Sequence, residues 1–274
     1  MFVFGDSILD VGNNNYIASL AKANYVPHGI DFGGPTGRFT NGRTIIDIIG
    51  QQIGVDLFIP PYLAPTTTGD VILKGVNYAS GGGGILNQTG YIFIKNINMD
   101  AQLDDFANTR EDIISLIGES AAKKLLKSNA LFTIAMGSND FINNYFVPII
   151  SKGERIFVSP QSFVTTLITK LKIQLQRLYT MDARKFLVAN VGPIGCIPYM
   201  RDNNPIEGRV HCYDYANQLA QLFNNKLEKL VSELSKEMEG SAFTRMMWAH
   251  TYAENPQGQI RRRRPNSNPP CAPA

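Results

Sequence analysis

The hydrophobic pattern of the chain contains four short apolar runs, each ending at small or polar residues. Runs of this length, bounded by turn-forming residues, predict β-strands that are buried on both faces of a sheet. The runs cover residues 2–4, 76–79, 130–136 and 185–191. Their ends are Gly5-Asp6-Ser7, the four glycines 81–84, Gly137-Ser138-Asn139-Asp140 and Gly192-Pro193.

Apolar residues at helical spacing lie between and after these runs. A helix is expected after Ser159-Pro160, an N-cap followed by proline, and a long one over 214–238. We interpret their apolar stripes as core packing rather than as a cofactor site. Further helices are expected at 16–22, 44–53, 99–116 and 119–127, with a surface loop at 31–43. The alternation of strands and helices predicts an α/β fold with a parallel sheet covered on both faces.

Three of the strand ends carry residues suited to chemistry. The carboxyl ends of parallel strands meet at one sheet edge, so we expect Ser7, the four glycines and Asn139 to lie together. A serine on a tight turn after a strand is a candidate nucleophile, but Gly-Asp-Ser is also an ordinary turn sequence. The glycines let backbone N–H groups approach a ligand. A phosphate cradle is the rival interpretation, but neither nucleotide-binding glycine motif is present.

The composition is that of a globular protein, with 44% hydrophobic and 18% charged residues in 274. No apolar run has the length of a membrane-spanning helix. The net charge of +3 depends on the run Arg261–Arg264, which we interpret as part of a solvated tail. In the rest of the chain, basic and aromatic residues do not alternate in the pattern typical of nucleic-acid-binding proteins. We therefore expect no nucleic-acid partner and no membrane span.

The cysteines and one sequon bear on the compartment. Cys196 and Cys212 bracket a short loop and would bridge in an oxidising compartment, whereas Cys271 lies near the end of the chain. No cysteine or histidine cluster has zinc-ligand spacing, so no metal or other cofactor is expected. Asn87-Gln88-Thr89 is a glycosylation sequon, which matters in a secreted protein. The first strand starts at Met1, so we expect no signal peptide.

Five motifs, taken in order, resemble the plant-type GDSL esterase/lipases of the SGNH hydrolase superfamily. They are Phe4-Gly5-Asp6-Ser7, Gly37-Arg38-Phe39-Thr40-Asn41-Gly42-Arg43, Asn77-Tyr78-Ala79-Ser80 with its glycines, Gly137-Ser138-Asn139-Asp140 and Val191-Gly192-Pro193-Ile194-Gly195-Cys196. The resemblance runs from residue 1 to about 240. It implies a three-layer α/β/α sandwich with a mostly parallel sheet, and ester hydrolysis through an acyl-serine.

The resemblance also implies roles for individual residues. Ser7 is similar to the family's nucleophile, with its own backbone N–H as one oxyanion donor. Gly84 is our choice for the second backbone donor, although the four consecutive glycines leave that choice open. Asn139 resembles the side-chain donor to the oxyanion; it is also a plausible helix N-cap, and the two roles are compatible. Fixed donors aimed at the developing charge stabilise a tetrahedral intermediate.

The family's base comes from an Asp-x-x-His pair near the C-terminus, and this chain has no such pair. Its histidines are His28, His211 and His250, and we interpret His28 and His211 as exposed or structural. After Phe243 the expected strand gives way to an Arg- and Pro-rich sequence that cannot fold alone. We therefore expect an incomplete hydrolase domain over 1–240, lacking its final strand and helix, and an aberrant, disordered tail over 241–274 from missplicing or a shifted frame.

These features predict a carboxylic ester hydrolase by family, with little or no activity in this chain. The alternatives are an inactive protein that binds an ester or acyl ligand and a non-functional isoform that does not fold stably. The expected partner is a small-molecule ester: an acyl lipid, an acylated sugar or a phenolic ester. The resemblance implies an extracellular location, although the chain has no visible means of export.

Overall fold

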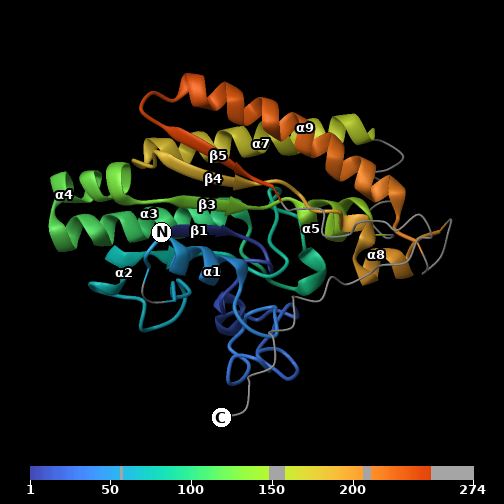
Figure 1. Ribbon diagram of the computed structural model, residues 1–274, viewed down its shortest axis with the longest axis horizontal. Helices are drawn as coiled ribbons and strands as arrows, with labels where there is room; N and C mark the ends of the chain where they lie inside the picture. The colour runs from blue at the N-terminus through green and yellow to red at the C-terminus, as the bar shows by residue number, and fades with distance from the viewer. Residues whose placement is uncertain (56–57, 148–157, 206–210, 248–274) are drawn as a thin grey trace, which may run out of the picture.

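The computed structural model describes residues 1–55, 58–147, 158–205 and 211–247 (Figure 1). Five strands in this part of the chain form one sheet in the order β2-β1-β3-β4-β5, and every neighbouring pair is parallel. The strands are β1 (Phe2–Gly5), β2 (Val76–Asn77), β3 (Phe132–Ala135), β4 (Lys185–Ala189) and β5 (Ala242–Met246). The parallel α/β sheet expected from the sequence is therefore confirmed.

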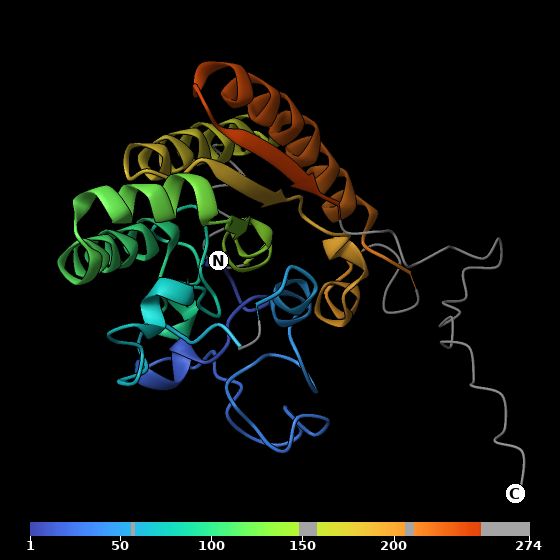
Figure 2. The ribbon, with the colours of Figure 1, turned by 60° about the vertical axis from the view of Figure 1, so that its left-hand side comes forward.

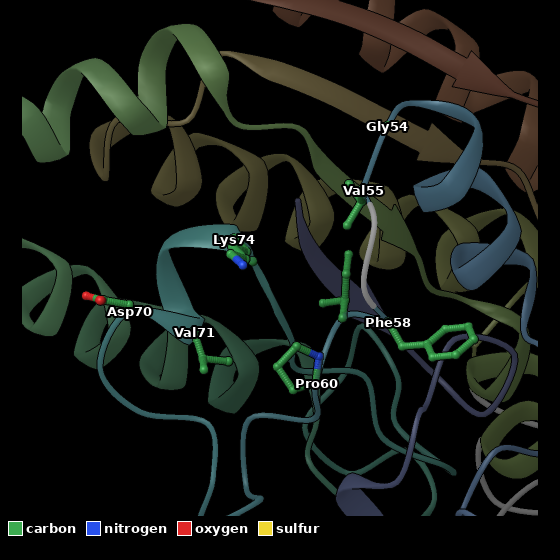
Figure 3. A pocket seen from close by; sticks show the side chains of 9 residues that line it. Gly54, Val55, Phe58, Pro60, Asp70, Val71 and Lys74 are labelled. Atoms are coloured by element: carbon green, nitrogen blue, oxygen red, sulfur yellow. The ribbon is translucent and has the colours of Figure 1, made fainter.

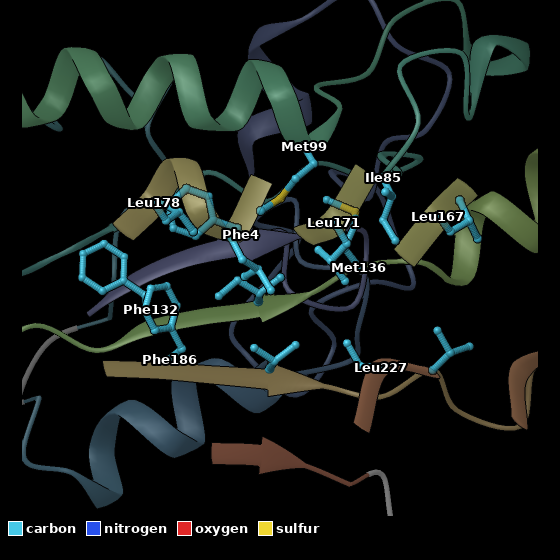
Figure 4. Packing of buried hydrophobic residues seen from close by; sticks show 14 of the residues in the cluster. Phe4, Ile85, Met99, Phe132, Met136, Leu167, Leu171, Leu178, Phe186 and Leu227 are labelled. Carbon is cyan, nitrogen blue, oxygen red and sulfur yellow. The ribbon is translucent and has the colours of Figure 1, made fainter. Parts of the chain in front are cut away.

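The central strands are apolar on both sides because both sides are covered by helices. Phe4, Phe132 and Phe186 point toward α3 (Met99–Ile117), α7 (Pro160–Thr180) and α9 (Asp214–Glu237), which cover one face (Figure 4). Val3, Ala135 and Ala189 point the other way, into a smaller cluster with Ile46 of α1 (Ile45–Gln52). Figure 2 shows α1 on the opposite side of the strands from α9. Helix, sheet and helix thus form three layers.

Short helices and turns connect these elements. The α-helical ones are α2 (Val71–Lys74), α4 (Glu119–Lys124), α5 (Ser138–Asp140) and α8 (Pro198–Asp202). Single turns of 3₁₀-helix lie at Asn13–Tyr16, Tyr91–Phe93 and Ile194–Cys196, and turns of π-helix at Leu125–Asn129 and Phe141–Tyr145. A disulfide joins Cys196 to Cys212, so the loop between β4 and α9 is closed covalently.

The sequence correctly predicts where α7 begins. The Ser159 side chain accepts a hydrogen bond from the backbone N–H of Ser162, and Pro160 occupies the first turn. Proline lacks the N–H that would stay unpaired at this position, and its φ angle suits a helix. In α1, Thr44 and Asp47 form a reciprocal capping box that satisfies two backbone N–H groups at the helix start.

Two expectations from the sequence are wrong. The strand expected to dissolve after Phe243 is formed over Ala242–Met246 and pairs along its whole length with β4, so these residues are not part of a disordered tail. Residues 248–274, which include His250, Arg261–Arg264 and Cys271, lie outside the described residues. The helix expected at 16–22 is absent: only a 3₁₀ turn is present, and it ends at Tyr16.

Candidate functional site

The ends of β1, β2 and β3 meet at one edge of the sheet. Gly5, the last residue of β1, lies level with Ala135 at the end of β3. The backbone N–H of Ser80 donates to the carbonyl oxygen of Gly5, so the glycine segment continues beside β1. The structure therefore brings Ser7, the glycines and Asn139 to the same edge, as the motif order predicts.

Ser7 follows β1 on a tight turn. The carbonyl oxygen of Asp6 accepts hydrogen bonds from the N–H groups of Leu9 and Asp10, which bends the chain back on itself. Gly5 is required here because a Cβ atom would lie 2.9 Å from the carbonyl oxygen of Ala135. The side chain of Ser7 is half-buried and forms no hydrogen bond with any described residue.

Gln102 of α3 fixes the end of β1 from the helical face. Its side-chain carbonyl oxygen accepts from the N–H of Gly5 at 2.9 Å, and its amide nitrogen donates to the carbonyl oxygen of Gly5 at 2.8 Å. The same nitrogen donates to the carbonyl oxygen of Ile97 at 2.8 Å. Gln102 is fully buried, so it supplies backbone partners that water cannot.

Two polar side chains from the segment after Ser7 hold the first glycine of the run. The Asp10 carboxylate accepts from the N–H of Gly81 at 3.0 Å, and the Asn14 side chain donates to the carbonyl oxygen of Gly81 at 2.9 Å. The Asn14 side-chain oxygen accepts from the hydroxyl group of Ser80. Both backbone polar groups of Gly81 are thus fixed by side chains. The sequence pattern gives no role to Asp10 or Asn14, because Asp and Asn runs are common in turns.

The four glycine amides divide into two that are bonded and two that are not. Gly81 donates to Asp10, and Gly83 donates to the carbonyl oxygen of Ser80 at 3.0 Å, closing a turn with Gly82 at φ +82°. That φ is unfavourable for a residue with a Cβ. Within the described residues, the N–H groups of Gly82 and Gly84 have no hydrogen-bond partner.

Asn139 and Asp140 anchor the end of β3 to the glycine segment. The Asn139 side-chain nitrogen donates to the carbonyl oxygen of Gly83 at 2.9 Å, and its oxygen accepts from the Asn143 side chain at 2.6 Å. One of the two amide hydrogens of Asn139 remains available. The Asp140 carboxylate accepts from the N–H groups of Ile85 and Leu86 and from the Thr89 hydroxyl group.

Three buried carboxyl groups surround this edge. Burial raises the pKa of Asp6 to about 7, and the Ile8 N–H, which donates to it at 3.0 Å, only partly offsets that effect. Burial likewise raises the pKa values of Asp10 and Asp140 to about 6. Hydrogen bonds from backbone N–H groups to both carboxylates, and from the Thr89 hydroxyl to Asp140, lower these pKa values but do not cancel the effect of burial. Desolvation disfavours the charged carboxylate, which explains the direction of all three shifts.

The motif around Arg38 has a structural role. The Arg38 guanidinium forms two hydrogen bonds with the Asp47 carboxylate, at 2.8 and 3.0 Å, and both side chains are buried. The rings of Phe32 and Phe58 lie 5.0 and 5.4 Å from the guanidinium carbon. This pair ties the loop at 31–43 to the first turn of α1.

No imidazole of the described chain is bonded to Ser7. His28 lies near Phe39, and its Nδ1 atom lies 3.1 Å from the carbonyl oxygen of Tyr25. His211 is exposed beside Cys212. The described residues also contain no group of three His, Cys, Asp or Glu side chains arranged for a metal ion.

An apolar hollow of about 390 Å³ lies away from this edge (Figure 3). Val55, Phe58, Pro60 and Val71 line it together with Lys74. The carbonyl oxygen of Lys74 accepts from the amino group of Met1, so the hollow lies at the amino end of β1, opposite to Ser7. It is therefore not the cleft of the candidate active site. No helix in the described ranges combines the length and the apolar character that crossing a membrane demands.

The chain is similar to known proteins over most of its length. A family model described as GDSL-like Lipase/Acylhydrolase matches residues 1–259. The chain belongs to this family. The GDSL esterase/lipase At4g16230 of Arabidopsis thaliana is 61% identical over 242 residues, which are 88% of this chain and 65% of the relative.

Two further relatives from Arabidopsis thaliana carry the same family name. GDSL esterase/lipase At3g50400 is 48% identical over 92% of this chain and 67% of its own length. GDSL esterase/lipase At2g23540 is 48% identical over 88% of this chain and 63% of its own length. The GDSL-like chain thus spans about two thirds of the length of these curated relatives.

Proposed function

We propose that this chain carries the nucleophile and the oxyanion site of a serine hydrolase acting on carboxylic esters. The observation that supports this most strongly is the meeting of a free Ser7 hydroxyl, unbonded glycine amides and the Asn139 side chain at one sheet edge. In this proposal the Ser7 oxygen attacks the ester carbonyl carbon, the C–O bond to the alcohol breaks and the alcohol leaves with the Ser7 proton; water then hydrolyses the acyl-serine to the carboxylic acid and free Ser7. Its own N–H, a glycine N–H and the Asn139 side chain donate to the oxyanion. No cofactor is required.

Gly82 is the stronger of the two candidate glycine donors. The N–H groups of Tyr78 and Ser80 donate to the carbonyl oxygens of Val3 and Gly5, so alternate amides of this segment face β1. The Asn14 side chain holds the carbonyl oxygen of Gly81, which orients the adjoining N–H of Gly82, and this N–H has no partner among the described residues. Gly84, the donor preferred from the sequence, is packed against Thr89 and Asp140, further along the loop. It remains the alternative donor.

The rate of the reaction depends on a base that can take the proton from Ser7. Among the described residues none is bonded to the Ser7 hydroxyl. Loss of the base from a serine triad lowers the rate by roughly 10⁶, and the oxyanion site and binding retain roughly 10³–10⁴ over water. We therefore propose that the chain on its own is a poor catalyst.

The unbonded Ser7 hydroxyl also favours a second candidate function. A protein with this pocket edge but no base would bind an ester or acyl ligand without turning it over. Both functions would use the same binding surface. They differ in whether the bound ester is cleaved and its product released.

A chromogenic short-chain acyl ester distinguishes them. The purified chain and its Ser7→Ala variant would be compared for product release, with mass spectrometry to detect an acyl group on Ser7 from the ester or, after treatment with a fluorophosphonate, a phosphonyl group. Slow release that disappears in Ser7→Ala supports the esterase. Ligand binding without any covalent adduct supports the binding protein, and equal release by both proteins contradicts a role for Ser7. Fast turnover that is lost in Ser7→Ala would contradict the proposal that the chain lacks a catalytic base. It would point to one of the histidines as that base.

We further propose an extracellular location. The Cys196–Cys212 disulfide is of a kind that persists in oxidising compartments. The Asn87 sequon lies on the surface and is open to glycosylation, whereas its Thr89 is buried against Asp140.

A further inference from the structure

Two loops beside the glycine segment expose many large apolar side chains. Val26, Ile94 and Leu20 are 76%, 72% and 68% exposed. Soluble proteins rarely expose contiguous apolar patches, and those that exist mark interaction surfaces. We call the whole set the apolar rim; its members are Tyr16, Leu20, Tyr25, Val26, Ile30, Tyr91, Ile92 and Ile94.

The two loops are joined to each other and to the glycine segment. The N–H of Leu20 donates to the carbonyl oxygen of Phe93 at 3.0 Å, which links the first loop to the second. A Cβ atom on Gly82 would lie 2.6 Å from the ring of Phe93, so the second loop packs directly on the proposed oxyanion glycine. The apolar rim therefore borders the candidate active site.

The other end of the first loop reaches the same glycines. The ring of His28 lies between Tyr25 and Phe39, with centroids 5.0 and 6.2 Å away. Phe39 in turn packs on Gly81, where an added Cβ would come within 2.5 Å of its ring. In Figure 1 the blue loops of this region extend below the sheet, away from the long helices α7 and α9.

Ile94 is held in a conformation that burial does not explain. Its φ of +70° and ψ of −57°, with a hydrogen bond of 2.8 Å from the N–H of Lys95 to the carbonyl oxygen of Phe93, define a strained γ-turn. A β-branched residue rarely adopts a positive φ. Strain of this kind gathers at sites of function, and here it turns an isoleucine side chain out into solvent.

The two loops that carry the apolar rim are basic. Residues 16–30 and 88–96 contain Lys22 and Lys95 and no aspartate or glutamate, and the nearest acidic residue in the sequence is the exposed Asp31 after Ile30. Tyrosines beside aliphatic residues and lysines are the mixture found where proteins meet the boundary between lipid headgroups and acyl chains. A surface with negative headgroups complements this charge.

We infer that the apolar rim docks on the surface of a lipid aggregate that carries anionic headgroups. The docked rim presents the edge with Ser7 to esters within the lipid layer. This inference deepens the proposed ester hydrolysis by naming its substrate class, and the docking step itself requires no catalysis.

Sedimentation with vesicles tests the docking directly. The full chain with Ser7→Ala, which leaves the lipid unhydrolysed, would be mixed with vesicles of phosphatidylcholine and phosphatidylglycerol in equal parts, and with phosphatidylcholine alone. We expect preferential binding to the anionic vesicles that weakens as salt is added. Leu20→Asp with Ile94→Asp should lower the partition coefficient at least about tenfold. Ile173→Asp, at an exposed isoleucine of α7, should change it less than about twofold.

A second variant separates docking from folding. Ile94→Gly relieves the positive φ, so we expect a thermal midpoint equal to or above that of the parent together with weaker vesicle binding. No sedimentation of the parent, or equal losses in the rim and Ile173 variants, would overturn the proposal. Self-association that depends on Ile94, without vesicle binding, would assign the apolar rim to a protein interface and also overturn it. Hydrolysis of a soluble ester is measured in a separate assay. A failure of vesicle docking can therefore be distinguished from a failure of the proposed ester hydrolysis.

Discussion

The side-chain amide of Asn14 donates to the carbonyl oxygen of Gly81 at 2.9 Å. The peptide bond is planar and trans, so holding the carbonyl group of Gly81 fixes the opposite direction of the N–H group of Gly82. A side chain seven residues after Ser7 in the sequence thereby orients the donor that we propose for the oxyanion.

Replacing Asn14 by alanine should therefore weaken the oxyanion site without touching the reacting atoms. We expect the rate of phosphonylation of Ser7 by a fluorophosphonate to fall roughly tenfold, a fraction of the loss caused by removing a donor itself. Mass spectrometry over time measures this rate.

Asn15→Ala is the matched control, because the Asn15 side chain donates to Thr36 rather than to Gly81. It should leave the rate within about twofold. Equal losses in the two variants would mean that Asn14 acts only through general stability.

Asn139→Ala removes a proposed donor directly. Its remaining amide hydrogen is aimed by the bonds to Gly83 and Asn143, so we expect the turnover number of any Ser7-dependent ester hydrolysis, or the phosphonylation rate, to fall about 10²–10³-fold. The KM should change little, because the interaction strengthens only as negative charge develops. A rise in KM at unchanged turnover number would contradict this role and assign Asn139 to substrate binding.

The raised pKa of Asp6 predicts how stability varies with pH. A carboxyl group whose pKa is about 7 in the folded state, against 3.8 ordinarily, binds its proton more tightly in the folded chain. Its contribution is fully present below about pH 4 and is lost as the pH rises through about 7. Asp10 and Asp140 act in the same direction. We expect the free energy of unfolding to fall by roughly 5 kcal/mol between pH 5 and pH 8, measured by urea denaturation.

Asp6→Asn should flatten this dependence and raise stability at pH 8, because the amide oxygen still accepts from the N–H of Ile8. An unchanged slope in this variant would show that other groups cause the pH effect.

Gln102→Ala should be among the more damaging substitutions of a polar residue. It leaves the buried N–H of Gly5 and the carbonyl oxygen of Ile97 without their side-chain partner. We expect a loss of about 3 kcal/mol, a fall in Tm of roughly 6–12 °C. Gln218→Ala, at an exposed glutamine of α9, should cost less than about 0.5 kcal/mol. Calorimetry of both variants measures the difference.

The sequence predicts the centre of this fold well, because the central strands are apolar on both faces. It fails at β5, which is an edge strand and carries two adjacent polar residues, Thr244 and Arg245. Phe243 of β5 stacks on Phe186 with centroids 4.4 Å apart, and Arg245 pairs with Glu228 of α9. These contacts come from distant parts of the chain, so the sequence of the strand itself contains no apolar run that would predict it.

The segment after Ser7 shows the same limit. Residues 16–22 have helical spacing, but the Ala21 carbonyl oxygen accepts from Asn14 and the Leu20 N–H donates to Phe93. Long-range partners therefore replace the hydrogen bonds of a helix. The motifs predict the meeting of Ser7, the glycines and Asn139, whereas the positioning role of Asn14 depends on a turn that the sequence pattern does not reveal. The run of three asparagines is the signal available, since their amides readily bond to backbone groups.

The strand order also has a consequence for synthesis. In the order in which the ribosome makes them, β2 can pair with β1, β3 can add to the free side of β1, and β4 and β5 can then extend the same edge. No strand of the described sheet has to be inserted between two that are already paired, so the sheet can grow in one direction, from β1 and β2 toward β5, as the chain emerges. We expect stalled nascent chains to gain resistance to protease in steps that follow β3, β4 and β5, with the edge bearing Ser7 formed before the last strand leaves the exit tunnel.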